Sequence, residues 1–169
     1  MAKRAIIALG SNLGEPVQNL KEAVERLQPL SVAEIRSSSI WKAMPVGFEE
    51  EVPEFCNAVV VFETDLEAQA LLDALKAIEA GMGRSPRKSG SYESRVIDLD
   101  IIDLGGLVLD ETGLTLPHPG AHERRFVLLP LKEVVPDYRF PGVDSSINAL
   151  IASAPSYPVQ RFIPLNPLV

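Results

Sequence analysis

The chain has 169 residues, of which 46% are hydrophobic and 23% are charged, and its formal net charge at pH 7 is -7. These values are typical of a soluble globular protein with a core of its own, and we expect residues 1–169 to form a single domain. The sequence contains no basic tail or stripe, which disfavours a nucleic-acid partner. No apolar run approaches the roughly 18 residues of a membrane-spanning helix, so we expect no membrane association.

The first residues and the single cysteine indicate a compartment. Residues 1–4 lead directly into a short strand-like run, without the apolar stretch of a signal peptide. Cys56 has no second cysteine with which to form an internal disulfide and lacks partners for a zinc site, so it is interpreted as a small buried hydrophobe. The cytoplasm is therefore the expected location.

The first third of the chain predicts a strand, a turn and a helix. Residues 5–9 are apolar and end at a turn, 10–14, with two glycines and an asparagine, which permit a positive φ. Pro16 stands at a favourable first helical position, and an apolar stripe at helical spacing follows it: Leu20, Ala23, Val24 and Leu27. A glycine-rich turn at this place could hold a phosphate, but it lacks the lysine and the spacing of a P-loop, so a structural turn is favoured.

Two more strands and a second helix follow. Residues 32–41 predict a strand that the three serines at 37–39 make irregular, and 42–54 predict a loop rich in Pro, Gly and acids. Residues 57–64 predict a third strand. Residues 66–80 predict a helix with one apolar face that stops at Gly81.

A basic segment, 83–95, precedes the most informative strand. It holds four of the sixteen Lys and Arg residues of an otherwise acidic chain and a single acid. Such a reversal of charge fits a site for a metal-bound polyanion, whereas a solvated surface loop is the alternative for Arg87 and Lys88. Arg95 argues more strongly for a site because the strand begins there.

Residues 95–102 predict a strand that presents two carboxylates on one face. Because side chains alternate along a strand, Asp98 and Asp100 share a face, with Cα atoms roughly 6.5–7 Å apart, while Leu99 points the other way. Two ionised groups this close repel each other unless a cation lies between them. Mg²⁺ is usually held by one or two carboxylates together with substrate phosphates, so the pair indicates a magnesium site. An edge strand with an acidic outer face is the alternative.

The remaining residues predict shorter elements. Gly105 and Gly106 predict a hairpin turn with a return strand at 107–109, and the prolines make 114–119 extended. Residues 127–131 predict a short buried helix, and 147–151 with the Pro-rich tail are expected to be peripheral. The order strand, helix, strand, strand, helix, strand is that of an α+β, ferredoxin-like βαββαβ core, an antiparallel sheet with helices on one face plus C-terminal additions.

Several short motifs together resemble one enzyme family, 6-hydroxymethyl-7,8-dihydropterin pyrophosphokinase of folate biosynthesis. The resemblance runs from Leu9 to about Pro136, and no block is specific alone, whereas their order and spacing are. The blocks are Leu9-Gly10-Ser11-Asn12-Leu13-Gly14, Pro45-Val46-Gly47, Phe55-Cys56-Asn57-Ala58, Ile78-Glu79, Gly83-Arg84, Arg95-x-x-Asp98-Leu99-Asp100-Ile101, Pro117-His118-Pro119 and Arg124-Arg125-Phe126-Val127-Leu128-x-Pro130-Leu131.

The resemblance implies a transfer of the terminal diphosphate of ATP, bound with two Mg²⁺ ions, to the pterin hydroxymethyl group, with release of AMP. By this resemblance Asp98 and Asp100 hold both metal ions, and Arg84 and Arg95 engage the phosphates with the support of Arg87 or Lys88. The residues that correspond to nucleotide contacts are Glu79, Ile101, His118 and Arg124.

The resemblance also implies a pterin pocket. Asn57 and the backbone at Pro45, Val46 and Gly47 would bind the edge of the ring, and Phe55 and Phe126 would stack on its two faces. A flat heterocycle needs aromatic faces and a donor–acceptor amide, which agrees with these residue types. The chain departs from the family at 92–94, where Tyr-Glu-Ser stands in place of Trp-Gly-Pro, and at 112–113.

Two other classes of function compete with this expectation. A metal-dependent phosphodiesterase or nuclease would use the same two aspartates, but it should show more acids and histidines together with a basic groove. A non-catalytic ferredoxin-like module would pair the acids and arginines with each other. We expect a monomer whose partners are small molecules, and the sequence offers no evident protein general base.

Overall fold

The computed structural model describes residues 1–43, 55–83, 96–155 and 159–165. A six-stranded sheet forms its centre, with the strand order β5-β1-β4-β3-β8, and β2 pairs with β4 beside β3. Every strand pair in this sheet is antiparallel. The strands are β1 (Lys3–Ser11), β2 (Arg36–Ser37), β3 (Ser39–Ala43), β4 (Phe55–Thr64), β5 (Asp98–Leu104) and β8 (Val159–Pro164).

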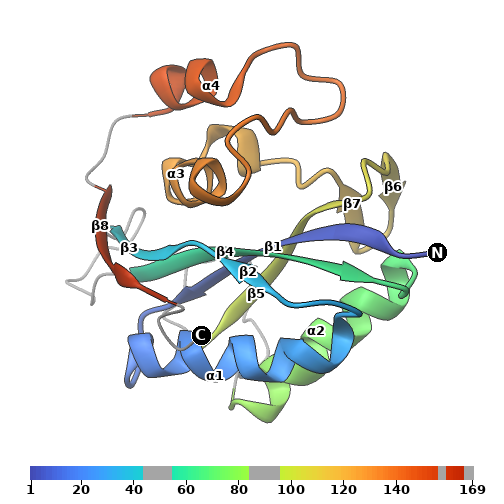
Figure 1. Ribbon diagram of the computed structural model, residues 1–169, viewed down its shortest axis with the longest axis vertical. Coiled ribbons are helices and arrows are strands. Elements are labelled where there is room, and N and C mark those ends of the chain that lie inside the picture. The colour runs from blue at the N-terminus through green and yellow to red at the C-terminus, as the bar shows by residue number, and fades with distance from the viewer. Residues whose placement is uncertain (44–54, 84–95, 156–158, 166–169) are drawn as a thin grey trace.

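Helices α1 (Pro16–Leu27) and α2 (Ala68–Gly81) cover one face of the sheet (Figure 1). Their apolar stripes bury Leu20, Leu27, Leu71 and Leu75. These side chains pack on the strand residues that point the same way, such as Leu9. This half of the molecule is the predicted ferredoxin-like α+β core, and Pro16 is the first helical residue as expected.

Helices α3 (Arg125–Val134) and α4 (Ile147–Ser153) lie on the opposite face (Figure 1). Val127 and Leu128 of α3 pack with Ile147 of α4 and with Ile6 of β1 in a second apolar cluster. The short buried helix expected at 127–131 is therefore confirmed, and it is longer than predicted. The expectation of helices on one face holds for α1 and α2 only, because the last part of the chain covers the second face.

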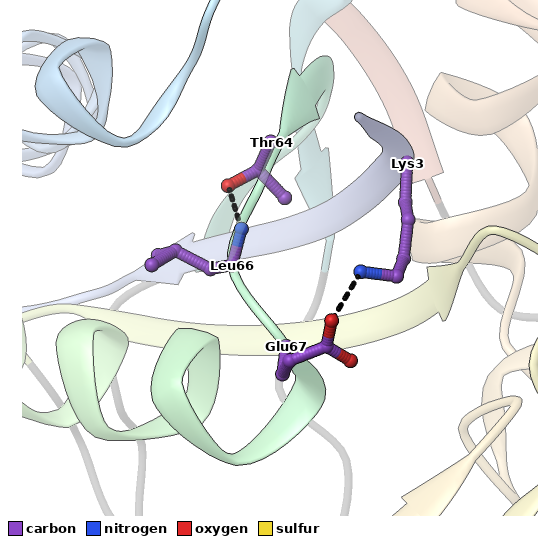
Figure 2. Close-up of polar contacts among 4 residues, drawn as sticks. All are labelled: Lys3, Thr64, Leu66 and Glu67. Atoms are coloured by element: carbon purple, nitrogen blue, oxygen red, sulfur yellow. Dashed lines mark hydrogen bonds and ion pairs between the residues drawn. The ribbon is translucent and has the colours of Figure 1, made fainter. Parts of the chain in front are cut away.

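Two polar contacts fix the passage from β4 into α2 (Figure 2). The backbone N–H of Leu66 donates to Oγ1 of the fully buried Thr64 at 3.1 Å. Nζ of Lys3, at the start of β1, lies 3.0 Å from Oε1 of Glu67, the residue before the helix. The helix begins at Ala68, two residues later than predicted.

Three expectations need correction. The predicted strand 32–41 is divided at Ser38, whose buried Oγ accepts the Val59 N–H at 2.9 Å and so interrupts the ladder. Residues 107–109 do not return along β5; instead β6 (Leu109–Glu111) pairs with β7 (Leu114–Leu116). The C-terminal segment is not peripheral, since α4 contributes to the second cluster and β8 extends the sheet beside β3.

The turn after β1 also differs from the expectation. Gly10 lies within the paired part of β1, and the turn follows Ser11, with Gly14 at a φ of 68°. In the described part of the chain, no helix is both long and apolar enough to cross a bilayer.

Candidate active site

The candidate site lies on the face of the sheet that α3 covers. Gly10 of β1 pairs with Asn57 of β4 on one side and with Asp98 of β5 on the other, and Ala8 pairs with Asp100. Directly paired residues of antiparallel strands project from the same face, so these side chains form adjacent rows. A cavity lies over these rows, and its lining includes Gly10, Asn57, Asp98, Asp100, His118, Arg124 and Phe126.

Successive side chains of β5 point alternately toward the cavity and toward the α1/α2 side of the sheet. Asp98 and Asp100 are half-buried in the cavity, whereas Leu99 between them is buried on the α1/α2 side. The backbone N–H of Leu99 donates to Oε2 of Glu79 at 2.7 Å, and Glu79 is itself buried in α2. A carboxylate from the helix therefore supports the strand at the residue between the two aspartates.

Asn57 forms one wall of the cavity beside a position that has no side chain. Its amide is buried, with 6% of the residue exposed, and Nδ2 has no hydrogen-bond partner among the described residues. A Cβ atom at Gly10 would lie 3.1 Å from Oδ1 of Asn57. Gly10 thus leaves the floor of the cavity open between the amide and Asp98, and the buried Nδ2 is available to a ligand.

His118 is held by two backbone groups. Its N–H donates to the Ile102 carbonyl of β5 at 2.9 Å, and its Nδ1 accepts the Gly120 N–H at 3.1 Å. Burial lowers the pKa of His118, the Arg124 guanidinium lowers it further, and Asp98 opposes both. The neutral ring that results carries its proton on Nε2, because Nδ1 is an acceptor.

Arg124 and Phe126 come from the start of α3. The Arg124 guanidinium carbon lies 5.9 Å from the centroid of the Phe126 ring, within the range of a cation–π contact. A Cβ atom at Gly120 would approach the same guanidinium to 3.2 Å, so the glycine lets the arginine lie against the backbone. A cation and an aromatic face consequently border the same cavity.

The structure brings together six residues that the sequence selected: Asn57, Asp98, Asp100, His118, Arg124 and Phe126. Three others are outside the lining of this cavity. Ile101 packs in the α1/α2 cluster, Glu79 contacts the backbone of β5, and Phe55 opens β4 opposite Ala43. Their roles as nucleotide or pterin contacts stay predictions.

Six further predicted residues belong to the ranges outside the described residues: Pro45, Val46, Gly47, Arg84, Arg87 and Arg95. In contrast, Ala8 and Ile102 line the cavity without having been selected, and Gly10 was noticed only as part of a turn. The glycine in a strand was the available signal, because Gly within a strand often marks a close approach of another group.

An α+β sheet lines one cavity with a carboxylate pair, a cation and an aromatic ring, which are groups suited to an anionic ligand and to a flat one. The model of the 7,8-dihydro-6-hydroxymethylpterin-pyrophosphokinase (HPPK) family matches residues 6–136, which is more than half of the chain. The chain belongs to this family and is an enzyme of the pyrophosphokinase class.

Relatives and solved structures agree with this assignment. The chain is 36% identical over 164 residues to 2-amino-4-hydroxy-6-hydroxymethyldihydropteridine pyrophosphokinase of Haemophilus influenzae, covering 96% of this chain and 98% of that protein. It is 35% identical over 162 residues to the Pseudomonas aeruginosa protein of the same name, with 95% and 98% covered.

The fold is that of an HPPK-DHPS protein solved in complex with substrates, with a TM-score of 0.70 at 16% identity. That superposition covers 90% of this chain and 44% of the solved chain. The wild-type Plasmodium falciparum HPPK-DHPS structure with pterin and p-hydroxybenzoate gives the same TM-score and identity, with 90% and 42% covered. The likeness at this identity concerns the fold alone.

Proposed function

We propose that this enzyme transfers the diphosphate of ATP to the hydroxymethyl group of 6-hydroxymethyl-7,8-dihydropterin and releases AMP. The observation that carries the proposal is the row in which Asn57, Gly10 and Asp98 lie side by side across three strands. This row puts a buried amide, suited to the edge of a heterocycle, next to a carboxylate, suited to a metal-bound phosphate.

The pterin occupies the Asn57 side of the cavity. The amide of Asn57 offers the donor and acceptor that a pterin edge requires, and its Nδ2 lacks a partner among the described residues. Phe126 supplies a ring on which the pterin stacks, at an energy of about 0.5–1.5 kcal/mol beyond its buried area. Phe55 and the backbone at 45–47 complete this pocket in the proposal.

The triphosphate of ATP lies on the side of Asp98 and Asp100. Two carboxylates on one strand face, half-buried beside His118 and Arg124, form an oxygen donor set that fits Mg²⁺ held jointly with phosphates. We assign both magnesium ions of the reaction to this pair. When bound, the ions neutralise charge on the bridging and leaving oxygens.

The protein groups around the phosphates act through charge and position. Arg124 contributes a fixed positive charge, and Nε2–H of the neutral His118 donates a hydrogen bond. Arg84 and Arg95 bind the phosphates with Arg87 in support, and Glu79 and Ile101 form the nucleotide side of the site.

The oxygen of the pterin hydroxymethyl group attacks the β-phosphorus, the bond from that phosphorus to the α–β bridging oxygen breaks, and AMP departs. The hydroxyl proton passes to solvent or phosphate, since phosphoryl transfer needs position and charge more than a protein base.

The proposal also covers the domain organisation, oligomeric state, location and partners of the protein. Residues 1–169 act as one pyrophosphokinase domain, which works as a cytoplasmic monomer on small-molecule substrates. Neither nucleic acid nor a membrane takes part, in keeping with the net charge of -7.

The nucleotide product tests the reaction. The protein is incubated with ATP, Mg²⁺ and the reduced hydroxymethylpterin, and nucleotides are separated and quantified with and without the pterin. We expect one AMP for each pterin consumed and no AMP when the pterin is omitted. Stoichiometric ADP would contradict diphosphate transfer, and the absence of any pterin-dependent product would favour a non-catalytic binding module.

A further inference from the structure

A carboxylate of α3 binds three donors of β3, at the far end of the helix from the cavity. Oε1 of Glu133 accepts the Ser39 N–H and the Trp41 Nε1–H, each at 3.0 Å. Oε2 accepts the Ser39 hydroxyl at 2.6 Å. Ser39 is buried, with 8% of it exposed, so its donors have little access to water. These contacts form a clamp between Glu133, Ser39 and Trp41.

The clamp lies in the row that forms the floor of the site. Trp41 of β3 pairs with Asn57, which pairs with Gly10, which pairs with Asp98. Trp41 therefore extends the row by one strand on the same face of the sheet. The Arg161 guanidinium of β8 lies 5.7 Å from the Trp41 ring centroid, so the indole is contacted from the edge strand as well.

Helix α3 connects the clamp with the cavity. Phe126 and Glu133 are seven residues apart, which is two turns and about 10.5 Å along one side of a helix. That length spans about two strand spacings of 4.7–4.9 Å. The helix thus crosses strands of the sheet, with Phe126 over the cavity and Glu133 over β3, and it packs on both β3 and β4.

We propose that Glu133 is a positioning residue for the substrate pocket. By fixing the end of α3 to Ser39 and Trp41, it sets the separation between the Phe126 ring and the Asn57 amide. The inference rests on the proposed function, because it assumes that the flat substrate binds between these two groups. The requirement is for hydrogen-bond acceptance by a side chain of this length, not for the negative charge.

Three variants and one matched control test this assignment. Glu133→Ala removes all acceptors, and Trp41→Phe removes one donor but keeps a ring. Glu133→Gln retains one oxygen for the two N–H donors and presents an amide to the Ser39 hydroxyl, which can accept. The control is Arg36→Ala, because Nη1 of Arg36 donates to the Val134 carbonyl at 3.3 Å and also ties α3 to the sheet, through β2 and outside the row.

The experiment measures pterin affinity, Mg-ATP affinity and the free energy of unfolding for each full-length variant. In the wild type and the variants that retain Trp41, the single tryptophan of the chain, its fluorescence is recorded as well. We expect Glu133→Ala to weaken pterin binding about tenfold, the order of the net effect of one hydrogen bond. Trp41→Phe should weaken it less, and Glu133→Gln and Arg36→Ala should bind the pterin like the wild type. Trp41 emission should change in Glu133→Ala and stay unaltered in Arg36→Ala.

Two results would overturn the inference. Unchanged pterin affinity in Glu133→Ala, with altered Trp41 emission, would show that the clamp exists without setting the pocket. An equal loss in Arg36→Ala would show that any tie on α3 has the same effect. A wild-type protein that binds no pterin would instead contradict the proposed function, and the wild-type titration shows this before any variant is compared.

Discussion

The two faces of the central sheet are made from the same strands and have different compositions. On the α1/α2 face, Leu9 of β1 and Leu99 of β5 are buried among helix leucines. The next pair of the ladder, Gly10 and Asp98, projects from the α3 face, where both residues border a cavity. At this end of the two strands, successive residues thus belong alternately to the α1/α2 core and to the site.

Stability and activity therefore depend on different faces of the sheet. The α1/α2 face buries apolar side chains, and each large one contributes about 1.5–3 kcal/mol to folding. The α3 face keeps two carboxylates close enough to repel each other, and it buries an amide nitrogen without a protein partner in the described part of the chain, which disfavours folding. Substitutions in adjacent residues should therefore separate stability from activity.

Removing either aspartate should have the largest effect. Asp98→Ala or Asp100→Ala should lower turnover about a thousandfold or more, since the metal-borne charge stabilisation is worth several kcal/mol. The free energy of unfolding should stay equal or rise, because one of two repelling charges is gone. Steady-state kinetics at saturating Mg²⁺ and denaturant unfolding of the same samples measure both. A variant with most of its activity would exclude the metal role.

Replacing Leu99, between the two aspartates, should lower stability and leave turnover almost unchanged. Leu99→Ala leaves a cavity in the α1/α2 core and should cost about 2–5 kcal/mol of unfolding free energy. At a temperature where the variant is folded, its turnover should stay within severalfold of the wild type, because the backbone and Glu79 still hold β5. A loss of turnover as large as that of Asp98→Ala, in a fully folded Leu99→Ala protein, would show that the two faces are not separable.

Replacing Asn57 should weaken the binding of the pterin without lowering the stability of the protein. Asn57→Ala removes a buried amide whose Nδ2 lacks a partner among the described residues, so stability should be equal or slightly higher. Pterin binding should weaken by about 1–3 kcal/mol, because polar edges of the ligand lose their partner. Calorimetric titration with each ligand measures the change, with Mg-ATP as the control. Equal losses for pterin and Mg-ATP would point to a general defect of the site.

His118 should give the smallest effect, visible as a pH dependence of stability. Burial and Arg124 lower its pKa below the ordinary value of 6.5, so the unfolded chain binds the proton more readily than the folded one. The contribution of the neutral His118 ring to the free energy of unfolding is therefore complete above pH 6.5, and it is lost as the pH falls toward the lowered pKa.

The matched variant for this effect is His118→Gln, which keeps an acceptor for the Gly120 N–H and does not titrate. Unfolding is measured without metal or nucleotide between pH 8 and pH 5, about the range in which histidine titrates. The stability advantage of the wild type over the variant should shrink as the pH falls. A difference that is constant, or that grows toward low pH, would contradict the lowered pKa.

Local patterns were sufficient for part of this architecture. The periodicities of 5–9, 57–64 and 66–80 predicted β1, β4 and α2 within a few residues, because these elements bury one clear face. The alternation around Leu99 in β5 likewise predicted that Asp98 and Asp100 share a face, and both line the same cavity.

The remainder depended on long-range contacts. Nothing local in 159–164 indicates a strand, since β8 forms only by pairing with β3. The division at Ser38 depends on a hydrogen bond to Val59, a residue far away in the sequence. The row that joins Asp98 to Asn57 is set by the pairing register of three strands, and Gly10 acquires its role in the site only from that register.

Mg-ATP binding by the wild type and by Asp98→Asn tests whether the carboxylates on the α3 face hold the metal-bound nucleotide. Calorimetric titration with ATP is performed with Mg²⁺ and with EDTA, without pterin, on proteins shown to have equal unfolding free energies. We predict Mg²⁺-dependent binding by the wild type and at least about a tenfold loss in Asp98→Asn. Equal affinity of the two proteins, or binding that ignores Mg²⁺, would contradict the account.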